Sequence, residues 1–240
     1  MAKPPAASIL EALLERHGQT YAQELGIEVA KGTPSPLFRL LVASILFSAR
    51  IGAGQAVKAA RALTDVGWTT AEKLAATSWR ERVRVLNRHG YARYDERTAS
   101  MLGDACELLL DRYRGDLRRL RAEAGQDPRQ ERRLLKEVEG LGEVGVDIFF
   151  REAQVAWEEL FPFLDRRAAQ AAHRLGLDTD PRGAGRQPGP RGVRAAGGRA
   201  GPHRADQRLR RGARGRPSQV ARLTTFVHVR GAPWRSADHR

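Results

Sequence analysis

The stretch from residue 134 to residue 167 constrains the fold of this chain most strongly. An apolar run with helical spacing is followed by a short turn that contains two glycines, and a second apolar run extends from about 144 to 157. A proline-containing loop then brings Asp165 to the start of a further helical run at 166–175. The sequence therefore predicts two consecutive helices joined by a tight turn, and a third helix that begins directly after an aspartate.

The turn itself is built around Leu141, which Gly140 and Gly142 flank. Glycine adopts positive φ without steric cost and lets a backbone approach another group closely. The turn opens onto a helix N-terminus, where N–H groups lack intrahelical acceptors and the helix dipole favours an anion. It is therefore a candidate phosphate-binding element. The alternative is an ordinary corner between two helices.

This combination of turn and aspartate resembles the signature of the HhH-GPD DNA glycosylases, which include endonuclease III and the adenine and alkyladenine glycosylases. The run 139–145 occupies the hairpin position, and Asp165 follows Gly140 by 25 residues. The resemblance covers about 36–177 and implies an all-α fold with two helical lobes and a DNA-binding cleft between them. It implies that a helix-hairpin-helix grips double-stranded DNA beside a damaged base, through these residues: Gly140, Leu141, Gly142, Val144 and Gly145.

The resemblance also implies a catalytic role for Asp165. A carboxylate near the sugar can stabilise an oxocarbenium-like transition state or activate a water molecule. Aspartate before a helix is also a favoured N-cap, and both roles can coexist. Bifunctional members carry a lysine two residues after the second glycine, where this chain has Val144, and the nearest lysine is Lys136. We therefore expect a monofunctional N-glycosylase without AP-lyase activity.

Cysteine usage limits the cofactors. Cys106 is the single cysteine, so a disulfide within the chain, a thiolate zinc site and the four-cysteine iron–sulfur cluster of some family members are excluded. We expect no metal or cofactor, although a monovalent cation at the hairpin is conceivable. Glu143 places a negative charge where many members have a cation, which lowers the affinity for phosphate.

Further DNA contacts are expected after the run 36–50, which is apolar on nearly all sides and predicts a buried central helix. Its terminal Ser-Ala-Arg triplet is similar to the Ser-Ala-Gln of endonuclease III-like proteins, which implies that Arg50 enters the duplex. The alternative is a solvated arginine at a helix C-terminus. The loop 88–94 supplies cations and stacking surfaces, with His89 and Tyr91 as DNA contacts. The alternative is that this loop is an ordinary connection between two helices with surface residues, and the sequence favours neither interpretation.

Asp147 is a lone carboxylate on the apolar second helix and therefore needs a partner. It could line a base pocket near Asp165, for which Tyr94 is the other candidate. It could instead pair with Arg151 four residues later, and we favour this pairing.

We expect three segments, 1–35 with an N-terminal helix at about 9–16, the HhH-GPD domain at 36–180, and a tail at 181–240 that differs in charge. The net charge is +14. The tail holds fifteen arginines, no lysine, two aspartates and no glutamate, so it carries +13 and the rest only +1. Its composition predicts disorder. It is either a basic tail that binds nucleic acid or the product of a shifted reading frame, with 219–229 as a remnant of ordered structure.

The sequence has no apolar stretch long enough to span a membrane and no signal peptide. We expect a monomeric, cytoplasmic, nucleoid-associated protein. One alternative is a helix-hairpin-helix protein that binds DNA without catalysis. Another is a damaged product that lacks its C-terminal helices.

Overall fold

The structure is a computed structural model that describes residues 6–177, and every regular element in that part is helical. The all-α class is therefore confirmed for it, whereas the tail at 181–240, with its run 219–229, lies outside the described residues. The helices are α1 (Ala6–His17), α2 (Tyr21–Glu24), η1 (Val29–Lys31), α3 (Pro34–Ser48), α4 (Ala53–Asp65), α5 (Ala71–Ala75), α6 (Trp79–Arg88), α7 (Asp95–Tyr113), α8 (Leu117–Glu123), α9 (Pro128–Leu135), α10 (Glu143–Ala153), η2 (Glu158–Leu160) and α11 (Arg166–Leu175).

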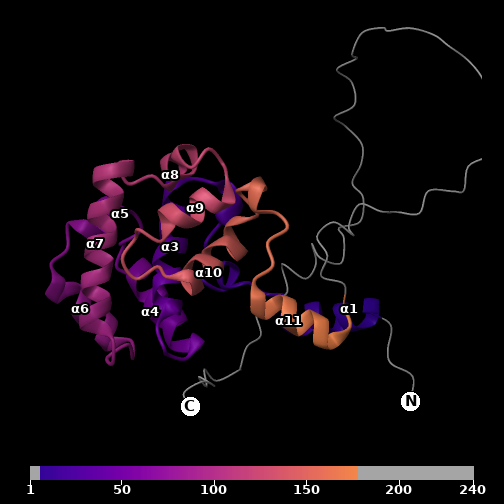
Figure 1. The fold of residues 1–240 in the computed structure, drawn as a ribbon. Helices are drawn as coiled ribbons and strands as arrows, with labels where there is room; N and C mark the ends of the chain where they lie inside the picture. Colours follow the sequence, from indigo (N-terminus) through magenta and orange to yellow (C-terminus); the bar gives the residue numbers. More distant parts are fainter. Residues whose placement is uncertain (1–5, 178–240) are drawn as a thin grey trace, which may run out of the picture.

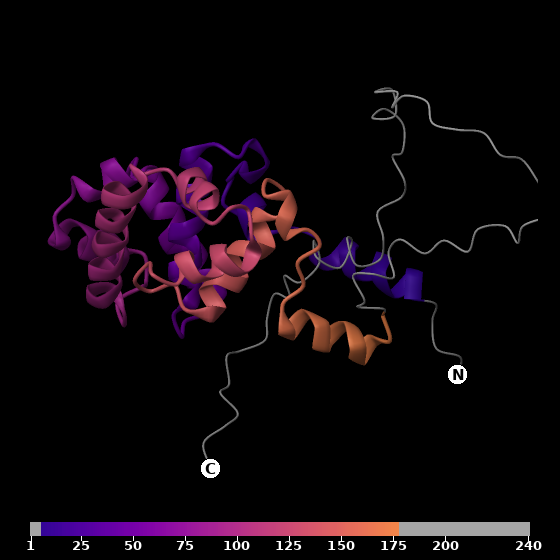
Figure 2. The ribbon, with the colours of Figure 1, turned by 45° about the horizontal axis from the view of Figure 1, so that its top comes forward.

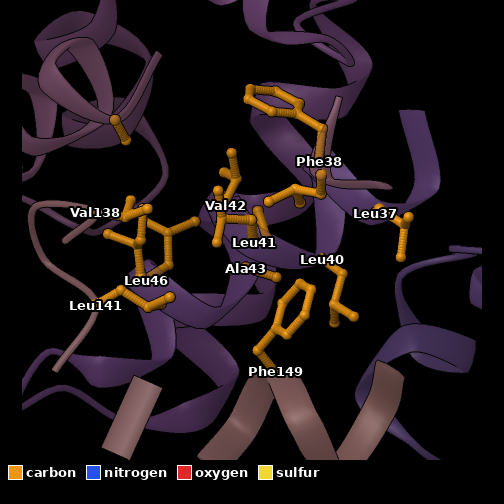
Figure 3. Close-up of a cluster of buried hydrophobic side chains, with 14 of the residues drawn as sticks. Leu37, Phe38, Leu40, Leu41, Val42, Ala43, Leu46, Val138, Leu141 and Phe149 are labelled. Atoms are coloured by element: carbon orange, nitrogen blue, oxygen red, sulfur yellow. The ribbon is translucent and has the colours of Figure 1, made fainter. Parts of the chain in front are cut away.

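The centre of the molecule is α3, as its uniformly apolar sequence predicts (Figure 1). Both Leu37 and Leu41 are completely buried, and most of the other side chains of this helix are buried too. Figure 3 shows Phe149 of α10 on one side of α3, with Val138 and Leu141 on another. Because α3 is covered by α4, α7, α8 and α10, it fixes the relative positions of the surrounding helices.

Local capping explains why many of the helices begin where they do. The hydroxyl of Ser78 accepts a hydrogen bond from the Glu81 amide, and the Glu81 carboxylate returns to Ser78, which forms a capping box at the start of α6. Thr70, Asp116 and Asp127 cap α5, α8 and α9 through their side chains. The bounds of α11 agree with the expected run at 166–175, and those of α7 agree with the helix that the sequence predicts at about 95–113.

The second helix of the turn, α10, is shorter than the predicted run of 144–157 because it ends at Ala153. Its C-cap residue, Gln154, donates from Nε2 to the Arg151 carbonyl oxygen at 2.8 Å and accepts from the Phe163 amide at 3.0 Å. This side chain satisfies a carbonyl of the last turn and ties the helix end to the following loop. The preceding helix, α9, likewise ends at Leu135, earlier than Val138, where the sequence predicts its end.

The first and last helices pack on each other rather than on α3. In Figures 1 and 2, α1 and α11 lie beside the remaining helices. Their shared cluster buries only Leu10, Ala172 and Leu177, with several half-buried leucines around them. The chain leaves α11 through Gly176, which has φ of +70° and so ends the helix in the left-handed region.

Candidate nucleic-acid interface

The turn between α9 and α10 rests on the central helix. Gly140 has φ of +84°, as expected for a glycine that reverses the chain. A Cβ atom at this position would lie 2.9 Å from Sδ of Met101 and 3.1 Å from Cγ2 of Ile45. Leu141 is 1% exposed and packs inward. Gly142 differs, because its φ is −73° and a Cβ atom there would meet nothing within 4 Å. Of the two glycines that flank Leu141, only Gly140 is therefore required, because only this position combines positive φ with close packing.

The start of α10 presents backbone donors. Gly142 is the N-cap and provides no side-chain acceptor, and the first bond within the helix runs from the Val146 amide to the Gly142 carbonyl oxygen at 3.0 Å. The amides of residues 143–145 therefore have no acceptor within the helix. Gly145 allows close packing here, since a Cβ atom would lie 2.6 Å from Oγ of Ser48. These donors are thus held directly against the C-terminal end of α3, where they could bind an anion.

Ion pairs join α9 to α10 beside this turn. Arg132 of α9 donates to Glu143 at 2.9 Å and to Asp147 at 2.6 Å, and Lys136 also pairs with Glu143. The prediction that Asp147 pairs with Arg151 is therefore wrong. Its partner is Arg132, which α9 places across the turn. The hydrogen bond from Lys136, followed by that from Arg132, lowers the pKa of Glu143. Two cations thus offset the negative charge that the sequence placed in the turn.

Asp165 is the N-cap of α11, as the sequence allowed. Its Oδ1 accepts hydrogen bonds from the amides of Arg167 and Ala168, each at 2.9 Å, and its Oδ2 accepts one from Arg151. The side chain is only 4% exposed. Arg151 lies two helical turns after Val144 on the same side of α10, roughly 10 Å along the axis. Both carboxylate oxygens are therefore occupied, at the end of α10 opposite the glycine turn.

A cavity of about 720 Å³ opens next to Arg151. Its walls come from residues 20–31, from the C-terminal end of α10 and from Phe161, and they are mainly apolar. Two large apolar side chains of this wall are exposed, Val155 by 62% and Phe161 by 52%. Arg151 lines the cavity and its guanidinium binds Asp165, so this residue connects the two.

The 88–94 loop is only partly a surface feature. Tyr91 is 1% exposed, and its hydroxyl donates to the Leu46 carbonyl oxygen at 3.0 Å. The structure thus contradicts the expectation that its ring stacks on a base, because the ring belongs to the core. Burial raises the pKa of Tyr91 to about 12. His89 is exposed, and its Nδ1 contacts the Val85 carbonyl oxygen at 2.8 Å.

Arg50 and Tyr94 remain near the surface. Arg50 is exposed and follows α3, which ends at Ser48 instead of reaching residue 50 as predicted. Tyr94 is half-buried at the start of α7, with the guanidinium carbon of Arg93 5.4 Å from its ring centroid. In the part of the chain that the structure describes, neither Tyr94 nor Asp147 forms a hydrogen bond to Asp165. The two pocket candidates are therefore not held against that carboxylate.

Three separate pieces of sequence nevertheless meet at the C-terminal end of α3. The turn contacts it through Gly140 and Gly145, and the 88–94 loop contacts it through Tyr91. The start of α4 contacts the same loop, because Nε2 of Gln55 donates to the Gly90 carbonyl oxygen at 3.4 Å. Arg50 leaves α3 at this same end. The sequence identified the turn, the loop and Arg50 as separate candidates. It did not show that they meet, because the contacts between them involve small groups and backbone atoms that no local pattern reveals.

Comparison of the chain with known protein families, with curated proteins and with solved structures finds no match in any of the three. Within residues 6–177, no group of three or more His, Cys, Asp or Glu side chains is arranged to hold a metal ion. Cys106 is buried, and burial raises the pKa of its thiol to about 12. In the same part, no helix has the length and apolar character needed to cross a membrane.

Proposed function

We propose that this protein is a monofunctional base-excision DNA glycosylase of the HhH-GPD type, acting on double-stranded DNA that contains a damaged or mispaired base. The observation that carries the proposal is the meeting of the glycine turn, Arg50 and the 88–94 loop at one end of α3. Backbone donors at the start of α10, together with the exposed side chains of Arg50 and His89, suit a phosphate backbone and an opened base pair.

The proposed roles follow from these positions. The amides of residues 143–145 bind a phosphate, because they lack helical acceptors and lie at the positive end of the α10 dipole. Arg50 enters the duplex where the base has left the stack. Val144 has no nucleophilic group, so cleavage of the N-glycosidic bond proceeds without a Schiff base and without strand nicking.

Asp165 can act only after one of its oxygens is released. Oδ1 caps α11 through two amides, whereas Oδ2 is bound by the single guanidinium of Arg151. Because Arg151 also borders the 720 Å³ cavity, it has space in which to turn away. Oδ2 would then face the sugar while Oδ1 continues to cap the helix. One carboxylate thus serves both the fold and the reaction.

The closed setting of Asp165 favours a second candidate function, a helix-hairpin-helix protein that binds DNA without turnover. A carboxylate that is 4% exposed and paired with an arginine is an ordinary structural group. In this alternative the turn still clamps the phosphate backbone, and Arg151 never releases Asp165.

Base release separates the two functions. We would incubate wild type and Asp165→Asn with duplexes that carry different damaged bases and measure free base separately from strand nicking. Asparagine keeps the capping acceptor, so the variant should fold. Release by wild type alone is expected for the glycosylase. Tight binding by both proteins without release would establish the clamp instead, and nicking without added alkali would contradict the argument from Val144.

A further inference from the structure

A row of arginines runs along α6. Arg80, Arg84 and Arg88 recur at four-residue spacing, so they share one face of the helix and span about 12 Å along its axis. All three are exposed, and none forms an ion pair within the described part of the chain. The carboxylate of the nearby Glu81 accepts hydrogen bonds from both the amide and the hydroxyl of Ser78 at 2.7 Å. These hydrogen bonds, and to a lesser extent the charge of Arg84, lower the pKa of Glu81.

The arginine row leads into the candidate interface. Arg88 is the last residue of α6, and His89 and Gly90 follow it. The Gly90 carbonyl oxygen accepts from Gln55, which follows Arg50 by five residues. This hydrogen bond therefore connects the residues that follow α6 with the start of α4, which comes next after α3 in the chain.

Six other arginines of the described residues pair with carboxylates: Arg112, Arg118, Arg121, Arg132, Arg133 and Arg151. The first 180 residues together carry a charge of only +1. Three unpaired cations in line on one helix therefore give this face a positive potential that the body as a whole lacks.

We propose that the arginine row of α6 binds DNA phosphates and extends the contact with the duplex beyond the glycine turn. The proposal rests on the proposed function in one respect, because it takes double-stranded DNA as the partner. Each phosphate that an arginine neutralises releases counterions, so the row contributes to affinity in a salt-dependent way and independently of base sequence. A solvated helix face would make no such contribution.

The test uses the full chain and an undamaged duplex of fixed length. The row variant is Arg80→Gln, Arg84→Gln and Arg88→Gln together. The matched control changes three exposed arginines that also lack ion pairs, Arg114→Gln, Arg119→Gln and Arg129→Gln. Arg114 and Arg119 lie just beyond the far end of α7, a helix of 19 residues, or about 28 Å. Both variants lose the same charge, so they differ only in where it is lost.

Dissociation constants would be measured at several salt concentrations, with thermal unfolding as a check of folding. We expect the slope of log affinity against log salt to fall by roughly 0.9 per lost contact in the row variant and much less in the control. Affinity at low salt should fall at least about tenfold. The triple Lys variant of the row should restore the slope, because lysine also neutralises a phosphate.

Three outcomes would overturn the proposal. An unchanged slope in the row variant, with wild type still bound, would make α6 a solvated face and leave the proposed function intact. Equal losses in the row variant and the control would reduce the effect to total charge. Absence of any binding by wild type would remove both this proposal and the proposed function.

Discussion

Two glycines of the same turn have different physical roles. A side chain at Gly140 would meet Met101 and Ile45 and would require an L residue to adopt φ of +84°. At Gly142 the backbone is extended and the surrounding space is open. The sequence pattern could not separate the two, because the difference depends on packing against α3 and α7.

Alanine substitution should reveal this difference. Gly140→Ala combines backbone strain with a steric clash, and we expect a loss of about 2 kcal/mol or more in the free energy of unfolding. Gly142→Ala should cost less than about 1 kcal/mol, because only its capping preference changes. Urea unfolding of both variants measures the contrast. Equal losses would show that the turn does not pack on Met101 and Ile45 as described.

A buried carboxyl makes stability depend on pH. Glu131 is completely buried near Glu159, which pairs with Arg121. Burial first, and then the neighbouring Glu159 carboxylate, raise the pKa of Glu131 from 4.5 to about 8. The folded protein therefore holds a proton that the unfolded chain releases above about pH 4.5. Since the unfolded state binds fewer protons, stability contributed by this group falls as the pH rises from about 4.5 to 8.

Glu131→Gln should remove that dependence. Glutamine can donate to Glu159 but does not ionise, so the variant should be more stable than wild type at pH 8 and similar to it near pH 5. Thermal unfolding across this range measures both curves. A wild-type curve that rises between pH 5 and 8, with the variant parallel to it, would contradict the assignment to Glu131.

At the scale of helices, local patterns predicted the most where capping residues and apolar spacing agree. The limits of α7 and α11 followed from the sequence, as did the buried α3. The end of α10 did not, because Gln154 stops it through contacts with the loop at Phe163. The partners of Asp147 and Asp165 were also missed, since arginines can reach them from outside their own turn of helix.

The pair of α1 and α11 should be less stable than the rest. The hydrophobic cluster that these helices share contains only three buried side chains, whereas most of α3 is buried. We expect its amides to exchange with deuterium faster than those of α3, because little apolar surface opposes local opening. Leu10→Ala should speed exchange in α11 and leave α3 unchanged. Faster exchange in α3 as well would mean that the two clusters unfold together.

For the whole molecule, the positive charge and the helical fold belong to different parts of the chain. Residues 181–240 carry +13, whereas the preceding part is nearly neutral. The all-α class and the candidate turn could be predicted because helical periodicity and paired glycines are local signals. The meeting of the turn, Arg50 and the loop at α3 could not, because it depends on how distant helices pack.

Removing residues 181–240 should weaken binding to undamaged DNA at low salt by at least about tenfold, because many phosphate contacts are lost. Substitution of the α6 arginine row should still lower the salt slope in this shortened chain, since that row belongs to the body. Titrations with and without the tail measure the two contributions. Full retention of affinity without the tail would assign the binding to the body alone.

The contact between Gly145 and Ser48 has a mechanical consequence. With only a hydrogen atom at position 145, α10 packs closely on α3, because a methyl group there would lie 2.6 Å from Oγ of Ser48 and 2.9 Å from Cδ1 of Leu141. A movement at the start of α10 therefore displaces Ser48 at the end of α3, and so the backbone that leads to Arg50. In the proposed function, the amides proposed to bind phosphate and the arginine proposed to enter the duplex would then move together.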